Sequence, residues 1–157
     1  MARINSLYAS GQLQAPTNAS GGVECHVRAE IALAAAVASG DVLAFLPLPA
    51  GYVVTDWALD NDDCDTGTTL AADLGLLTAA GTAISSAAAD GGKWKSATTA
   101  LQAAAVTRNS AGSAAEQTAL ARMASASSDR MIALVATAAG TGGVGAKIGL
   151  TVWLKSV

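Results

Sequence analysis

Charge is scarce in this sequence of 157 residues. Lys and Arg number 9, Asp and Glu number 12, and together they make up 13% of the chain, about half the usual share in soluble domains. The net charge of −3 excludes a nucleic-acid-binding surface. A folded monomer of 15.4 kDa exposes on the order of 7,000 Å², which so few charges cover thinly. We therefore predict a chain that buries part of its surface against copies of itself or another protein.

Long hydrophobic runs are missing too. No stretch reaches the ~20 apolar residues that span a bilayer, because the run at 31–38 is followed by Ser39, Gly40 and Asp41. Residues 4–15 are polar and mixed, without the apolar segment of a secretory signal. We expect no membrane partner, and synthesis in the cytoplasm.

The chain has one histidine and two cysteines, which leaves little for catalysis or metal binding. His26 would need a nucleophile or several metal-binding partners, and the sequence assembles neither set. We therefore expect no enzyme activity and no cofactor. Cys25 and Cys64 can pair only if the fold makes them neighbours. In a cytoplasmic product, two buried thiols are the favoured alternative.

Alternation of apolar and polar residues is the main positive signal, and it predicts half-buried antiparallel strands. Four inward-facing rows are predicted: Cys25, Val27, Ala29, Ile31 and Leu33; Val53, Thr55, Trp57 and Leu59; Leu70, Ala72, Leu74 and Leu76; and Ile148, Leu150, Val152 and Leu154. Residues 42–46 and 131–137 predict two further strands. The fold is therefore predicted to be mainly β, an antiparallel β sandwich with one decorated edge.

Two segments in the 95–124 region depart from this alternation. Residues 96–106 are rich in Ala and Leu at helical spacing, and they predict a short helix. Ser113 and Glu116 have the spacing of a capping box, which predicts a second short helix over 117–124. A loop or an edge strand is the alternative for that second segment.

The N-terminal residues 1–22 show no sustained period and predict an extended arm, with residues 23–157 forming a single β-sandwich domain. Such an arm is either a frayed terminus or a segment that reaches a neighbouring subunit. Tyr8 and Leu13 are its candidate interface residues.

Glycines near the C-terminus match a nucleotide-binding pattern. Gly140, Gly142 and Gly145 have the G-x-G-x-x-G spacing. That fingerprint must open a helix, whereas an alternating strand follows here. We interpret these glycines as a hairpin turn between two final strands.

An acidic cluster occupies the loop after the second predicted row, with Asp60, Asp62, Asp63 and Asp65, and Asp73 lies beyond it. The cluster does not match the ligand pattern of an EF-hand. With Asp62 as the first ligand, the third and fifth positions are Cys64 and Thr66. We interpret the cluster as a turn whose side chains bind their own backbone, with an ion site as the alternative.

Three tryptophans dominate the few aromatic residues. Trp57 shares a predicted inward row, so it is assigned to the core. Trp94 lies between Lys93 and Lys95, and Trp153 lies on the face of Lys147 and Lys155, so both are predicted to be exposed. Tryptophan on an alanine-rich surface is a natural interface anchor. The candidate interface residues are therefore Trp94, Trp153, Lys93 and Lys95.

Two stretches carry most of the strand and turn signals: GDVLAFLPLPAGYVVTDWALDNDDCDTGTTLAADLGLL at 40–77 and SDRMIALVATAAGTGGVGAKIGLTVWLKS at 128–156. The first contains the turn Leu48-Pro49-Ala50-Gly51, an Asp-rich turn and the strand ADLGL at 72–76. Over roughly residues 41–155 the chain resembles the small structural proteins of tailed bacteriophages, with a two-strand unit at its end.

This resemblance implies a jelly-roll-like β sandwich that acts as a capsid decoration, or cement, protein on the virion exterior. It implies a homodimer or homotrimer whose other partner is the major capsid protein. The arm and residues 93–124 are the candidate contact elements. Two alternatives stay open: another virion part, such as a head fibre base, tail or baseplate component, and a carbohydrate-binding module that stacks sugars on Trp94 or Trp153.

Overall fold

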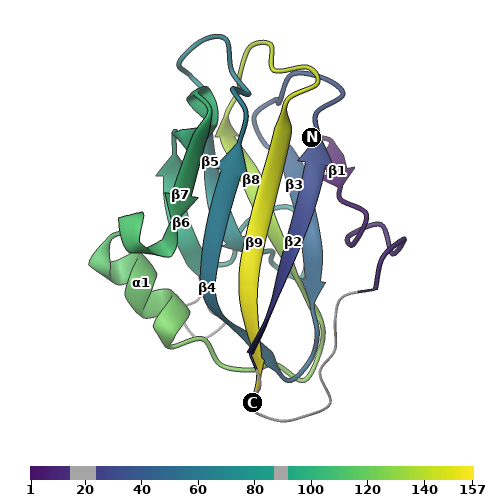
Figure 1. Cartoon of the computed structure of the whole chain (residues 1–157), viewed down its shortest axis with the longest axis vertical. Coiled ribbons are helices and arrows are strands. Elements are labelled where there is room, and N and C mark those ends of the chain that lie inside the picture. Colours follow the sequence, from purple (N-terminus) through teal and green to yellow (C-terminus); the bar gives the residue numbers. More distant parts are fainter. Residues whose placement is uncertain (15–23, 87–91) are drawn as a thin grey trace.

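Two β-sheets packed face to face form the body of the protein (Figure 1). The computed structural model describes residues 1–14, 24–86 and 92–157. Sheet A has the order β1 (Arg3–Asn5), β3 (Val42–Leu48), β8 (Arg130–Ala138), β5 (Ala71–Leu76) and β6 (Lys93–Thr98). Sheet B has the order β2 (Glu24–Ala32), β9 (Lys147–Ser156), β4 (Tyr52–Asn61) and β7 (Ala105–Arg108). One α-helix, α1 (Ala114–Ala121), and two 3₁₀ turns at Ala100–Gln102 and Asn109–Ala111 complete the described elements.

The order of the strands is that of a jelly roll. From β2 to β9 the chain alternates between the two sheets at every step except β5 to β6, which are hydrogen-bonded neighbours. The sheets β3-β8-β5-β6 and β2-β9-β4-β7 are antiparallel throughout. Eight strands in two such sheets define the jelly-roll architecture. The predicted jelly-roll-like β sandwich is therefore confirmed, with β1 added in parallel to β3.

Side chains from the inner faces of both sheets build one main core. Its largest fully buried members include Trp57, Trp94 and Phe45. A second, smaller apolar cluster lies around Val42, Leu77 and Ile84. Burial of these side chains is the dominant favourable contribution to folding.

Three of the four predicted inward rows are correct. The rows that begin at Leu70 and Ile148 are buried throughout, and in β2 only Cys25 is partly exposed. In β4 the row is wrong at its start, because Val54 is buried and Thr55 is exposed. A β-bulge between Val54 and Asp56 in the pairing with β9 adds one residue and moves the start of the strand to the other face.

The predicted helix over 96–106 is wrong. These residues contain the end of β6, a 3₁₀ turn and the start of β7. Pairing with β5 overrides the helix propensity of alanine, and its register shifts erase the alternation that marks a strand. The second predicted helix exists as α1, although it spans Ala114–Ala121 and not 117–124. The predicted capping box is present: the Glu116 N–H donates to Ser113 Oγ at 3.3 Å, and the Ser113 N–H donates to Glu116 Oε2 at 2.7 Å.

The glycine-rich segment 139–146 is not a hairpin turn, because β8 and β9 belong to different sheets. It crosses over the end of the sandwich and packs against the loop that contains Asp62, Asp63 and Asp65, which we call the acidic loop. A Cβ atom on Gly143, whose φ is +73°, would lie 2.2 Å from the Cys64 carbonyl oxygen. Glycine is therefore needed here for close approach between two loops.

The N-terminal segment lies against its own chain as far as the structure describes it. Strand β1 pairs with β3, and the Ser6 N–H donates to the Ala44 carbonyl at 2.9 Å. Ile4 and Tyr8 pack on the main core. Residues 15–22 of the predicted arm are outside the described residues.

Candidate interface surfaces

Trp94 is in the core, so the expectation that it is exposed is wrong. It lies on β6 and is 0% exposed. The flanking lysines alternate to the other face and are half-buried in ion pairs, Lys93 Nζ with Asp73 Oδ2 at 2.6 Å and Lys95 Nζ with Glu116 Oε2 at 3.6 Å. Because successive side chains of a strand point to opposite faces, burial of Trp94 places both lysines on the outer face of β6.

Trp153 lies on the outer face of sheet B, where it is half-buried. It is directly opposite His26 in the pairing of β9 with β2, and the two ring centroids are 6.4 Å apart at an angle of 37°. Such cross-strand aromatic pairs stabilise a sheet by a few tenths of a kcal/mol to about 1 kcal/mol. Trp153 remains available as a contact residue, and its neighbour His26 is exposed.

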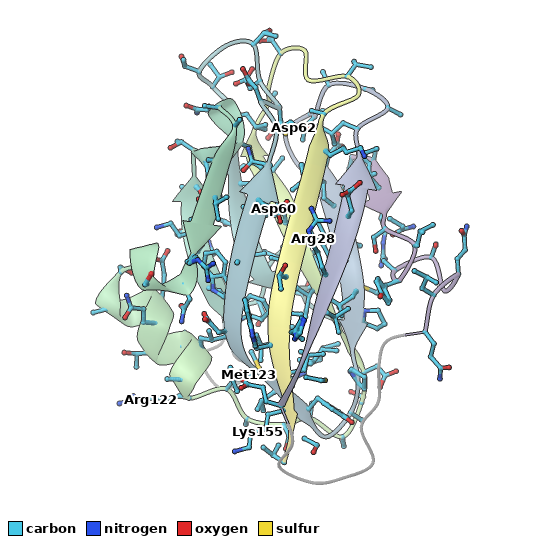
Figure 2. All side chains as sticks on the ribbon, in the orientation of Figure 1. Arg28, Asp60, Asp62, Arg122, Met123 and Lys155 are labelled. Atoms are coloured by element: carbon cyan, nitrogen blue, oxygen red, sulfur yellow. The ribbon has the colours of Figure 1, made fainter. Side chains whose placement is uncertain are left out.

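An ion-pair network occupies the same face nearer the acidic loop. Arg28 Nη2 on β2 lies 2.5 Å from Asp60 Oδ2 on β4, on either side of β9 (Figure 2). Arg28 Nη1 also lies 2.9 Å from Glu30 Oε2, and Lys147 Nζ lies 3.3 Å from Glu30 Oε1. Hydrogen bonds from Arg28 and then Lys147 hold the pKa of Glu30 below its usual value.

Gly149 makes this network possible, because the Arg28 side chain passes over it. A Cβ atom at position 149 would lie 2.2 Å from Arg28 Nη2 and 2.6 Å from Asp60 Oδ1.

Gly149→Ala is therefore expected to separate Arg28 from Asp60. The exposed pair contributes little, so the free energy of unfolding should change by less than about 1 kcal/mol. The salt dependence of Tm should become weaker than in the wild type. Thr151→Ala, on the same face of β9, is the control and should leave the salt dependence unchanged.

Asp65 is the centre of the acidic loop, and it is 1% exposed. Its Oδ1 accepts from the N–H groups of Thr141 at 2.7 Å and Gly67 at 3.0 Å, and its Oδ2 accepts from those of Leu70 at 2.8 Å and Thr69 at 2.9 Å. The Thr141 hydroxyl also donates to Oδ1 at 3.1 Å. These bonds, first those from Thr141 and Leu70, lower the pKa of Asp65 well below its usual range.

The neighbouring aspartates bind backbone in the same way. The Lys147 N–H donates to Asp62 Oδ2 at 2.9 Å, and the Asp65 N–H donates to Asp63 Oδ1 at 3.1 Å. The interpretation of the cluster as a backbone-binding turn agrees with these contacts. Within residues 1–14, 24–86 and 92–157, no group of three His, Cys, Asp or Glu side chains is placed to hold a metal ion.

Both cysteines are free thiols in this fold. Cys64 is fully buried, and its thiol lies 3.3 Å from the Asp62 carbonyl oxygen. Burial, with smaller contributions from Asp62 and Asp63, raises the pKa of Cys64 to about 11. Cys25 is partly exposed at the start of β2. The favoured alternative in the sequence, two buried thiols, therefore holds for Cys64 and is wrong in its burial of Cys25.

The interface candidates of the N-terminal segment occupy different environments. Tyr8 packs against the core from the outside, whereas Leu13 is 45% exposed. Leu13 borders a shallow hollow beside Pro47 and Pro49 at the end of β3. Leu7, which the sequence did not single out, is 53% exposed. The structure therefore brings neither Tyr8 nor Leu13 to Trp153, which lies on the other sheet.

Among the comparisons with known proteins, the one with solved structures found proteins of similar fold. No protein-family model matches the chain, and no curated protein matches it. A chain of the capsid of Ralstonia phage GP4 matches with a TM-score of 0.79 and 26% identity, over 99% of this chain and 98% of that chain. A chain of the capsid asymmetric unit of cyanophage Pam1 matches with a TM-score of 0.58 and 18% identity, over 92% and 93%. This jelly roll is thus a fold that occurs in phage capsids.

None of the helices in the described part of the chain is both long and apolar enough to cross a bilayer.

Proposed function

We propose that this chain is a structural protein of a tailed-phage virion, which binds the outside of the capsid as a homo-oligomer and stabilises the shell by bridging its subunits. The observation that carries the proposal is the match to a chain of the phage GP4 capsid at 26% identity over nearly the full length of both chains.

The physical character of the chain supports the same role. A decoration protein needs a rigid body and several contact surfaces. The body here is a jelly roll with an extensive core, and the outer face of sheet B carries Trp153 beside a charged network. An oligomer that contacts several capsid subunits gains avidity, since each further contact forms at a high effective concentration. Binding to the assembled shell and not to separated subunits then stabilises the shell by mass action.

Binding to shells tests the proposal. The recombinant chain should co-sediment with shells of the phage that encodes it, and a cryo-electron microscopy reconstruction should place it on the outer surface. Shells that carry the chain should withstand higher temperature than shells stripped of it. Absence of the chain from purified virions would refute any virion role, whereas its position on a tail or baseplate would favour the other virion assignment.

Trp153→Ala tests the contact surface within this proposal. Loss of a half-buried tryptophan at an interface is expected to weaken shell binding by about 10-fold or more. Thr151→Ala, on the same face of β9, is the matched control and should bind like the wild type. Unchanged binding of Trp153→Ala would remove sheet B around Trp153 from the interface.

The carbohydrate-binding alternative has lost one of its two platforms. Trp94 is fully buried and cannot stack on a sugar. Trp153 alone remains, and it is already covered in part by His26. Binding of the wild type to a glycan array would be the result that revives this alternative.

A further inference from the structure

The edge of sheet B formed by β2 is long and regular. All nine residues of β2 pair with β9 without a register shift, and β2 is the end strand of its sheet. Among the described residues no strand pairs with its other edge. In an antiparallel ladder every second residue turns its N–H and C=O groups away from its partner strand. The β2 edge therefore presents a row of backbone groups suited to one more strand.

The other sheet edges differ from β2 in length or regularity. Strand β7 has four residues and β1 has three. Strand β6 has two register shifts against β5 and is contacted by α1. Folded proteins protect edge strands with short length, bulges, proline or charged side chains, lysine above all. Strand β2, with the sequence ECHVRAEIA, is long and free of bulges, proline and lysine, and its charged side chains are of both signs.

The side chains of β2 are complementary to a second copy of the same strand. The exposed row contains Glu24, His26, Arg28 and Glu30, so it carries both signs of charge. If two β2 strands run antiparallel about a two-fold axis at Ala29, Arg28 lies opposite Glu30 of the partner subunit at two symmetric places. The inward row then places Val27 opposite Ile31 of the partner subunit, so apolar residues lie opposite apolar residues on the inner face.

Other registers are less favourable. An axis at Arg28 sets this arginine opposite Arg28 of the partner subunit. An axis at Val27 sets Glu24 opposite Glu30 of the partner subunit. An axis at His26 pairs Glu24 with Arg28 of the partner subunit but leaves only residues 24–28 of β2 paired. Like charges directly opposite each other destabilise a sheet, and opposite charges stabilise it. The charges therefore select the axis at Ala29.

We propose that two copies of this chain associate through antiparallel pairing of their β2 strands about a two-fold axis at Ala29, which makes one continuous eight-stranded sheet. The contact is isologous and closes on itself, so it gives a dimer and no filament. The inference deepens the homo-oligomer of the proposed function by naming its surface. The side that carries β2 is opposite α1 and β7 (Figure 1), so the helix stays free for other contacts.

Charge exchange between copies tests the pairing in the absence of any capsid. The wild type should sediment as a dimer. Arg28→Glu and Glu30→Arg should each weaken self-association by at least about 10-fold, because each sets like charges opposite one another twice. An equimolar mixture of the two variants should recover the dimer, since arginine and glutamate then face each other again. Glu24→Arg is the matched control, because residue 24 lies opposite a position beyond the end of β2.

A wild type that stays monomeric at the highest soluble concentration would overturn the proposal, and so would a Glu30→Arg variant that dimerises like the wild type. The third contrary result is a mixture of Arg28→Glu and Glu30→Arg that fails to associate although both variants retain the wild-type circular dichroism spectrum. Amide hydrogen exchange of the wild type gives an independent readout. Alternate amides of residues 24–32 should exchange more slowly as protein concentration rises, and a rate independent of concentration would contradict the pairing. A dimer that does not bind shells would refute the capsid role alone.

Discussion

Trp94→Ala is expected to lower the free energy of unfolding by about 3–5 kcal/mol. Trp94 is fully buried on the inner face of β6. Truncation to alanine removes its transfer free energy and leaves a cavity that the neighbouring strands can close only in part, because sheet pairing holds them in place. Urea denaturation followed by circular dichroism measures the loss. A loss of this size would consume a large share of the stability of an ordinary domain.

Trp153→Ala is the matched comparison for Trp94→Ala. The same substitution on the half-buried outer face of sheet B should cost about 1 kcal/mol or less. The two variants therefore separate a core role from a surface role for tryptophans that the sequence placed in one class. Equal losses in both variants would contradict the placement of Trp94 inside the sandwich.

The strands could be predicted because burial on one face imposes a period of two. The inward rows of β2 and β9 follow that period, and they are buried as predicted except at Cys25, which is partly exposed. The period fails where the ladder is irregular. The bulge near Thr55 in β4 and the register shifts between β5 and β6 are properties of strand pairs, so neither strand alone encodes them in its hydrophobic pattern.

Connections between strands could not be predicted in the same way. A glycine-rich turn between two alternating segments indicates a hairpin, yet β8 and β9 lie in different sheets. The deciding contacts join residues far apart in the sequence, such as Thr141 with Asp65 and Gly143 with Cys64. No local pattern marks such pairs.

The surface residues show the same limit. Lys93-Trp94-Lys95 is compatible with an exposed tryptophan or with a strand that buries it, and the packing of Trp94 in the main core decides between them. Conversely, the capping box at Ser113 and Glu116 was predictable, since all its atoms lie within one turn. Local chemistry could be read from the sequence, and the partners of each surface could not.

Asp65→Asn is expected to lower Tm by about 5 °C or more. The carboxylate accepts four backbone N–H groups with two oxygens, whereas a carboxamide has one accepting oxygen. Two buried donors would then face an NH₂ group, and the contact between the acidic loop and residues 139–146 should loosen. Asp63→Asn is the control in the same loop, since Asp63 accepts one bond from the Asp65 N–H. It should change Tm by about 2 °C or less.

The pH dependence of this difference isolates the charge of Asp65. Because its pKa is lowered in the folded state, its contribution is fully present above the ordinary aspartate pKa of about 3.9 and declines as the pH falls toward the folded value. The Tm difference between the wild type and Asp65→Asn should stay constant from about pH 7 to 5 and shrink below about pH 4. Asp41, whose pKa the Ala2 and Ala38 N–H groups also lower, titrates in both proteins and cancels in the difference. A difference that persists unchanged at pH 3 would mean that the shape of the side chain, and not its charge, holds the two loops together.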